Sequence, residues 1–206
     1  RGQFIFLEED PIEALHVLVE GHVKMIRETE DGREVILRVV CPSEVFGIAG
    51  FGAQMAQRFS AQANEDATVI EIPTEEFIQI LSVSPPSLQS TLRTIGALLR
   101  EVESRICDLQ TKDAESRLAG VLAQLATSSA TPAASVPFTL ALTRQDLADL
   151  AGTNLSTASR TVSAWAKAGF LSVGRAKIVV RDVGSLAAIA RGARLPEIDR
   201  RSDTGR

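Results

Sequence analysis

The sequence LTRQDLADLAGTNLSTASRTVSAWAKAGFLSVGRAKIVVRD, residues Leu142–Asp182, predicts a helix, a tight turn, a second helix and a short hairpin. Thr143 and, three residues later, Asp146 resemble a capping box, which satisfies free N–H groups at a helix start. Gly152 lies where the chain must turn sharply, so the first helix is expected to end near Ala151. This succession of elements is typical of a winged helix-turn-helix.

The second helix of this pair has an outward face that suits a DNA major groove. Asn154 is placed to cap its start. The inward stripe predicted from helical spacing consists of Ala158, Val162 and Trp165. The outward positions, which we expect to meet bases, are Ser156, Ser159 and Arg160. An arginine in such a place donates two hydrogen bonds to guanine O6 and N7, the commonest specific base contact.

A basic hairpin is expected after the second helix. Gly169 ends that helix, and Phe170–Val173 and Lys177–Arg181 are predicted strands around Gly174 and Arg175. A basic wing of this kind lies along phosphates. The residues expected to meet phosphates are Thr143, Arg144, Thr157, Arg175 and Lys177. The alternatives for the whole stretch are a winged helix that binds protein, or a helical core segment with a solvated polar face.

Charge is divided unevenly along the chain. Residues Phe138–Arg206 contain 11 Lys and Arg against 6 Asp and Glu, a net charge of +5. Residues Arg1–Pro137 contain 11 against 20, a net charge of −9, so the overall charge of −4 hides the division. A basic C-terminal module on an acidic body is the electrostatic pattern expected of a DNA-binding domain attached to a second domain.

Length and composition set further limits. With 206 residues, 45% of them apolar, the chain is long enough for two domains. No apolar run approaches the ~20 residues needed to span a bilayer, and no signal peptide is visible, so we expect a cytoplasmic protein without a membrane partner. The chain opens on Arg1 rather than methionine, so we expect that an N-terminal segment has been trimmed or left out. Cys41 and Cys107 form no metal-ligand motif, and no metal site is predicted.

Residues 3–73 have the pattern of β-structure. The predicted strands, separated by turn signals, are Phe4–Leu7, Leu15–Val19, His22–Arg27, Glu34–Val40 and Thr68–Ile72. The dipeptide Asp31-Gly32 favours a tight hairpin, because glycine accepts the positive φ that such a turn requires. Short antiparallel strands at this spacing imply a small barrel or jelly roll.

A heptad seam lies between the two regions. Apolar residues recur at alternating steps of four and three, at Leu88, Leu92, Ile95, Leu99, Val102, Ile106 and Leu109. Pro85-Pro86 suits a helix start. A single helix packed inside one domain is the alternative, but the strict 3.5-residue repeat favours a two-stranded coiled coil. A further amphipathic helix is predicted over Lys112–Ala126.

These patterns resemble the Crp/Fnr family of bacterial transcription regulators. Its recognition helix commonly carries Glu-x-x-Ser-Arg; Ser159 and Arg160 match, whereas Ser156 stands in place of a glutamate that would accept from cytosine N4. Residues Val17–Lys24 look like the family's first β-roll hairpin. The resemblance implies an α+β fold with three parts. These are an N-terminal β-roll, jelly-roll-like and of cyclic-nucleotide-binding type, over residues 1–84, a dimerisation helix over 85–111, and a winged helix-turn-helix DNA-binding domain over 112–206.

The resemblance also implies a function. The chain is expected to be a homodimeric regulator of transcription that binds a palindromic double-stranded DNA site, with RNA polymerase as a further partner. An effector in the roll would bias the long helix and change the separation of the two recognition helices. No catalytic constellation is visible, so an enzyme is not expected. The effector, the target promoters and the direction of regulation are not named by the sequence.

The effector segment departs most from the family. Members that bind cyclic AMP carry Gly-Glu-Leu, whose glutamate contacts the ribose, and an Arg-Ser pair for the phosphate; here Gly47-Ile48-Ala49 and Arg58-Phe59 stand instead. Ile48 accepts no hydrogen bond, so we expect an effector other than a cyclic nucleotide. The candidate pocket residues are Phe46, Gly47, Ile48, Phe51, Arg58 and Phe59. Ordinary packing is the alternative to a pocket for an apolar or aromatic ligand or haem.

Several sensor chemistries stay open. His16 and His22 are the obvious haem-ligand candidates, although a structural role suits their strand positions better, and Met25 is expected in the core. An N-terminal iron–sulfur cluster and thiol redox sensing through Cys41 or Cys107 are further alternatives. A rival class, a cyclic-nucleotide-type signalling module whose helical region contacts protein, would share the roll but lack the helix-turn-helix.

Overall fold

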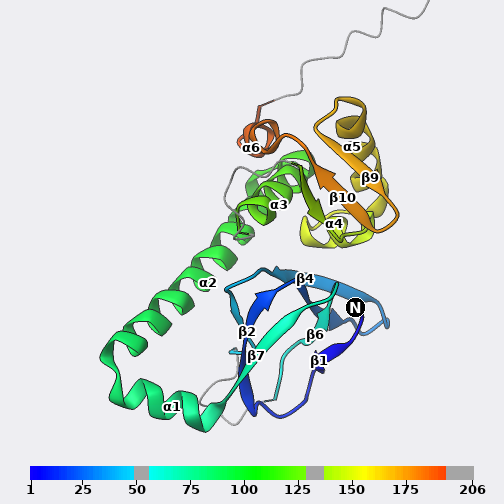
Figure 1. Cartoon of the computed structure of the whole chain (residues 1–206). Helices are drawn as coiled ribbons and strands as arrows, with labels where there is room; N and C mark the ends of the chain where they lie inside the picture. The colour runs from blue at the N-terminus through cyan, green and yellow to red at the C-terminus, as the bar shows by residue number, and fades with distance from the viewer. Residues whose placement is uncertain (49–55, 129–136, 194–206) are drawn as a thin grey trace, which may run out of the picture. The chain divides into compact units, whose positions relative to one another are not determined.

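The computed structural model describes residues 1–48, 56–128 and 137–193 of the chain (Figure 1). They fall into two compact units, of which the first contains Arg1–Thr111 and the second contains Lys112–Ala126 together with the described part of Ala133–Arg206. Among the described helices, none is both long and apolar enough to cross a membrane.

Two antiparallel sheets form the body of the first unit. The four-stranded sheet has the order β1 (Phe4–Phe6), β6 (Ser60–Ala63), β3 (Val23–Glu28) and β4 (Glu34–Val40). The three-stranded sheet has the order β5 (Val45–Phe46), β2 (Ala14–Glu20) and β7 (Thr68–Pro73). The five predicted strands are present as β1, β2, β3, β4 and β7. The short strands β5 and β6 were not predicted.

The core of this roll lies between the two sheets. Apolar side chains from both sheets meet there, namely Phe6, Leu18, Val23, Val40, Phe46 and Ala61. The turn between β2 and β3 depends on Gly21, which has φ +83°. A Cβ at this position would lie 2.5 Å from the carbonyl oxygen of Asp66, so the turn can approach the β6–β7 loop only with glycine.

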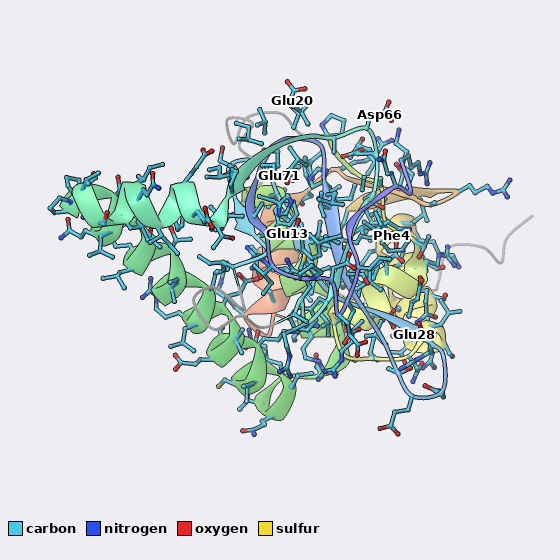
Figure 2. All side chains as sticks on the ribbon, turned by 90° about the horizontal axis from the view of Figure 1, so that it is seen from below. Phe4, Glu13, Glu20, Glu28, Asp66 and Glu71 are labelled. Atoms are coloured by element: carbon cyan, nitrogen blue, oxygen red, sulfur yellow. The ribbon has the colours of Figure 1, made fainter. Side chains whose placement is uncertain are left out.

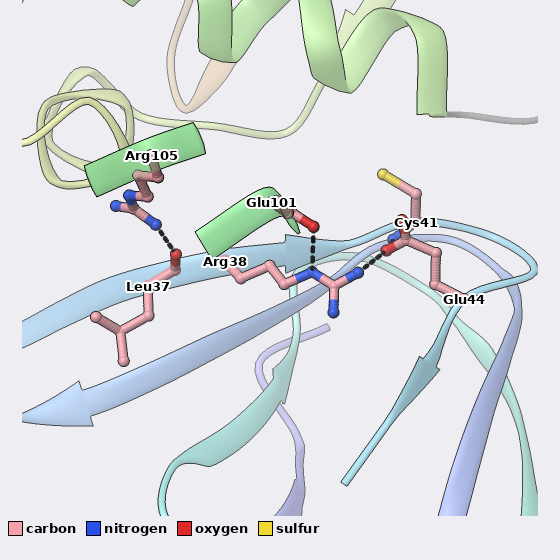
Figure 3. Close-up of polar contacts among 6 residues, drawn as sticks. All are labelled: Leu37, Arg38, Cys41, Glu44, Glu101 and Arg105. Atoms are coloured by element: carbon pink, nitrogen blue, oxygen red, sulfur yellow. Dashed lines mark hydrogen bonds and ion pairs between the residues drawn. The ribbon is translucent and has the colours of Figure 1, made fainter. Parts of the chain in front are cut away.

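Two helices follow the roll, α1 (Thr74–Val83) and α2 (Pro85–Thr111). The start of α2 at Pro85 confirms the predicted helix, whereas α1 was not predicted. One face of α2 is tied to strand β4, as Figure 3 shows: the Arg105 guanidinium donates to the carbonyl oxygen of Leu37, and Glu101 lies 3.8 Å from Nε of Arg38. Arg38 also donates to Glu44, at 2.8 Å.

In its described residues, the second unit has a small three-stranded sheet and four helices. The sheet has the order β8 (Phe138–Leu140), β10 (Lys177–Val180) and β9 (Leu171–Gly174). The helices are α3 (Ala114–Ser128), α4 (Arg144–Leu150), α5 (Leu155–Lys167) and α6 (Val183–Ala190). Strand β8 and helix α6 were not predicted. The core of the unit surrounds Trp165, the largest of the fully buried side chains.

Candidate functional site

The start of helix α4 has the predicted capping box. The Thr143 hydroxyl oxygen accepts from the backbone N–H of Asp146 at 3.0 Å, and the Asp146 carboxylate accepts from the backbone N–H of Thr143 at 2.9 Å. The helix ends at Leu150, and Gly152 has φ +60° in the turn that follows. The oxygen of the Thr143 hydroxyl is thus engaged by the backbone of α4, and Arg144 beside it is half-buried.

Helix α5 presents its predicted outward face. Asn154 caps its start by accepting from the backbone N–H of Thr157 at 2.8 Å. The predicted inward stripe is confirmed, because the buried residues of the helix are Ala158, Val162 and Trp165. Ser156 and Arg160 are exposed and Ser159 is half-buried. The exposed Arg160 side chain therefore lies near the small side chains of Ser156 and Ser159, and Leu155 at the start of the helix is also exposed.

The wing is present but is shifted by one residue from the prediction. Strand β9 runs from Leu171 and pairs Gly174 with Lys177 of β10, so the turn consists of Arg175 and Ala176 rather than Gly174 and Arg175. Ala176 takes the positive φ of this turn, +51°. Arg175 and Lys177 are exposed at its two ends. A basic tip therefore projects from the sheet as expected.

The base and phosphate candidates all lie on three segments of the second unit: the start of α4, the first turns of α5 and the wing. Helix α5 packs against both α4 and β9, which joins these segments into one body. The roll, by contrast, carries exposed carboxylates at Glu13, Glu20, Glu28, Asp66 and Glu71, which are labelled in Figure 2. The charges of the two units therefore favour the second unit as the place where a polyanion binds.

Histidine 16 occupies the roll next to the predicted effector segment. Its ring packs against those of Phe6 and Phe46, with centroids 5.2 Å from each, and those two rings are 6.0 Å apart, so the three form a cluster; only 6% of His16 is exposed. Its Nδ1 has no hydrogen-bond partner among the described residues. Gly47, at φ +79°, approaches so closely that a Cβ there would lie 3.1 Å from this nitrogen. Burial lowers the pKa of His16, and the carboxylate of Glu71 opposes this in part.

The other pocket candidates are not gathered in one place. Phe46 and Gly47 lie against His16, and Ile48 and Phe59 are half-buried, but Arg58 is exposed. Phe51 lies outside the described residues. The structure therefore brings two of the six candidates, Phe46 and Gly47, against one buried imidazole and leaves the only cation of the set exposed to solvent.

The remaining sensor candidates are His22, Met25, Cys41 and Cys107. His22 is buried and its Nδ1 lies 2.5 Å from a carboxylate oxygen of Glu65. Met25 packs against the core of the roll, Cys41 is buried and Cys107 is exposed on α2. Within the described ranges, no group of three or more His, Cys, Asp and Glu side chains is arranged to hold a metal ion.

Two sequence models match the chain: a cyclic nucleotide-binding domain over residues 1–84 and a Crp-like helix-turn-helix domain over residues 116–189. Electron transport regulator A of Shewanella oneidensis is 31% identical to this chain, with 95% of this chain and 78% of the relative covered. The fumarate and nitrate reduction regulatory protein of Salmonella typhimurium is 29% identical, covering 92% and 76%. A CRP-like cAMP-activated global transcriptional regulator of Mycobacterium tuberculosis is 26% identical, covering 93% and 86%.

Solved structures agree with these relatives. FixK2 from Bradyrhizobium japonicum superposes with a TM-score of 0.77 at 25% identity, covering 94% of this chain and 96% of its own. The CRP-family regulator TTHB099 from Thermus thermophilus has the same fold, with a TM-score of 0.74 at 22% identity over 94% and 95%. Roll, long helix and winged helix-turn-helix together define a DNA-binding transcription regulator. The chain belongs to the Crp/Fnr family, and its relatives are regulators rather than enzymes.

The buried imidazole of His16 makes stability depend on pH. Its pKa is lower in the folded roll than in the unfolded chain, so the unfolded state binds more protons below about pH 6.5. The free energy of unfolding is therefore highest above that pH, where His16 is neutral in both states, and it decreases as the pH falls. We expect the melting temperature of His16→Phe, which keeps the ring packing, to drop less than that of the wild type between about pH 7.5 and 5.5.

Glu71→Gln is the matched variant, because Glu71 raises the pKa of His16 and its loss should make the pH dependence steeper. Thermal unfolding followed by circular dichroism measures both. A His16→Phe protein with the pH profile of the wild type would contradict the assignment.

Proposed function

We propose that two copies of this chain bind a roughly two-fold symmetric DNA site and read bases with α5. The observation that carries the proposal is the exposure of Arg160 beside Ser156, on a helix whose opposite stripe is fully buried. A guanidinium so placed pairs with guanine O6 and N7, and small neighbours such as Ser156 and Ser159 let the helix approach the groove floor. Phosphates would be met by Thr143, Arg144, Thr157, Arg175 and Lys177.

The dimer would form through α2. All seven residues of the predicted heptad seam are between 44% and 60% exposed in the single chain. The contacts of Glu101 and Arg105 with β4 hold another face of α2 on its own roll, so this stripe is left for a second copy. Covering what each residue exposes is worth about 1 kcal/mol, because full burial of such a side chain is worth roughly 1.5–3 kcal/mol.

The dimer supplies the proposed symmetry. Two recognition helices related by a two-fold axis meet successive major grooves, about 34 Å apart, in the two halves of a palindromic site. An effector would act by changing their separation. RNA polymerase is the further partner that family membership supports, and the cytoplasm is the compartment in which such a regulator meets DNA.

The proposed effector is not a cyclic nucleotide. Ile48 offers no acceptor for a ribose hydroxyl, and Phe59 follows Arg58 where a small hydroxyl donor would serve a cyclic phosphate. Exposure of the Arg58 side chain supports the same view, because a buried phosphate needs a buried cation. An apolar or aromatic ligand, or haem, is the alternative chemistry, and Phe46 and Gly47 beside His16 are the described residues that would meet it.

Arg160→Ala tests the proposed function. This variant should lose about 1–3 kcal/mol of binding free energy at the specific DNA site, and its base preference should relax at one base pair of each half-site. Lys177→Ala is the contrasting variant. It should weaken binding to all DNA sequences alike and reduce the dependence of the affinity on salt concentration. Fluorescence anisotropy with specific and random duplexes measures both. An unchanged ratio of specific to non-specific affinity in Arg160→Ala would show that another face reads the bases.

Leu99→Asp tests the dimer. A carboxylate at the centre of the stripe would be buried in the interface without a partner, which costs several kcal/mol and should give monomers in sedimentation at micromolar concentration. Ser90→Asp adds the same charge at an exposed position outside the stripe and should leave the dimer intact. A monomeric wild type at that concentration would reject the proposed interface.

Titration calorimetry tests the effector. The hydrogen bonds missing at Ile48 and Phe59 should together weaken the binding of a cyclic nucleotide by roughly 2–6 kcal/mol if the two positions act independently. Any remaining affinity for cyclic AMP or cyclic GMP would be too low for regulation. Low-micromolar binding of either, accompanied by tighter DNA binding, would overturn the pocket argument and make Arg58 a phosphate ligand.

A further inference from the structure

The first turn of α3 contacts both α5 and the turn that joins α4 to α5. On one side, Glu115 accepts a hydrogen bond from the indole Nε1 of Trp165, at 3.3 Å. Trp165 is fully buried and is the only tryptophan of the sequence. It belongs to the inward stripe of α5, so this bond is a polar contact between α3 and the candidate recognition helix. A buried indole N–H without a partner would be destabilising, which makes the carboxylate of Glu115 a specific anchor.

On the other side, Arg117 holds the turn between α4 and α5. Its Nε donates to the carbonyl oxygen of Ala151 at 2.8 Å, and a terminal nitrogen donates to that of Gly152 at 3.1 Å. These carbonyls follow the last residue of α4, where helix carbonyls have no partner within the helix. The fixed fork of a guanidinium reaches two such oxygens at once, which a lysine ammonium does not do with the same geometry.

The same guanidinium reaches the linker that follows α2. Its other terminal nitrogen donates to the carbonyl oxygen of Lys112 at 2.6 Å, and Lys112 is the first residue after the end of α2 at Thr111. The linker, the first turn of α3 and the turn before α5 therefore share one side chain. A backbone movement at Lys112 would therefore be transmitted through the Arg117 side chain to Gly152, which lies two residues before Asn154, the cap of α5.

We infer that Glu115 and Arg117 are positioning residues for base reading, and that Arg117 also couples the linker after α2 to the recognition helix. The inference rests on the proposed function, because it concerns how α5 is aimed at bases. Neither residue belongs to the set expected to touch DNA. Their role is to fix the angle of α5, whose exposed Arg160 must meet a base edge within the narrow limits of a bidentate hydrogen bond.

The experiment compares conservative with disruptive variants of the full chain. Arg117→Lys keeps the charge but loses the fork, and it should lower the ratio of specific to non-specific DNA affinity by roughly tenfold or more, since it loses charged hydrogen bonds. Non-specific affinity and its salt slope should stay at wild-type values, because no phosphate contact is removed. Arg93→Met, which removes an arginine that bonds Gln89 on its own helix, is the control and should leave the ratio unchanged.

Trp165 supplies a readout that does not need DNA. Glu115→Ala should shift the emission maximum of this single tryptophan, whereas Glu115→Gln, which keeps an accepting oxygen, should retain the wild-type spectrum. Hydrogen exchange at the α4–α5 turn and at Lys112–Asp113 should become faster together in Arg117→Lys, because one side chain holds both.

The outcomes separate the two proposals. The positioning role would be overturned by wild-type emission from Glu115→Ala or by a wild-type affinity ratio from Arg117→Lys. The coupling would be overturned by hydrogen exchange that becomes faster at only one of the two segments. A wild-type protein without sequence preference would instead contradict the proposed function, and the emission and exchange measurements would still test the contacts of α3.

Discussion

An apolar stripe along a 27-residue helix is the constraint on which the rest of the molecule depends. Helix α2 holds its own roll with charged groups, as at Arg38, Glu101 and Arg105, and leaves a continuous row of Leu, Ile and Val exposed. A continuous exposed apolar row of this kind is typical of a protein interface, and we propose that a second copy of the chain covers it. The resulting two-fold axis would in turn set the symmetry of the DNA site.

The second unit leaves exposed the face of α5 that we propose reads DNA. Thr143, Asp146 and Asn154 satisfy the N–H groups at two helix starts with side chains, so neither start needs to be buried for its backbone groups to be paired. Trp165 and its neighbours fill the interior behind α5. Ser156 and Arg160 are among the residues that stay exposed on α5, and the wing carries the exposed cations Arg175 and Lys177.

Much of this could be predicted from the sequence, because the features concerned are local or periodic. The capping box, the Asn154 cap and the buried stripe of α5 depend on spacings of three or four residues. The start of α2 at Pro85 was predicted in the same way, and the residues predicted as a heptad seam are exposed along this helix in the single chain.

Features that depend on distant segments were missed. Strand β8 has only three residues, and it is a strand because it pairs with β10, about forty residues later in the chain. Strands β5 and β6 are as short and depend on β2, β1 and β3. Helix α6 did leave a signal, an Asp182 cap that accepts from the N–H of Ser185. Nothing local could show that Arg117 donates to three carbonyl oxygens, or that Nδ1 of His16 is buried without a hydrogen-bond partner among the described residues.

The central claim is that a dimer delivers two copies of α5 to one symmetric DNA site. Selection of bound duplexes from a random-sequence pool, followed by sequencing, tests it most directly, because it assumes neither an effector nor a promoter. The account predicts enrichment of an inverted repeat whose half-sites are centred about 10 base pairs apart, or a multiple of that spacing. Enrichment of a single unrepeated motif, or of no motif, would contradict it.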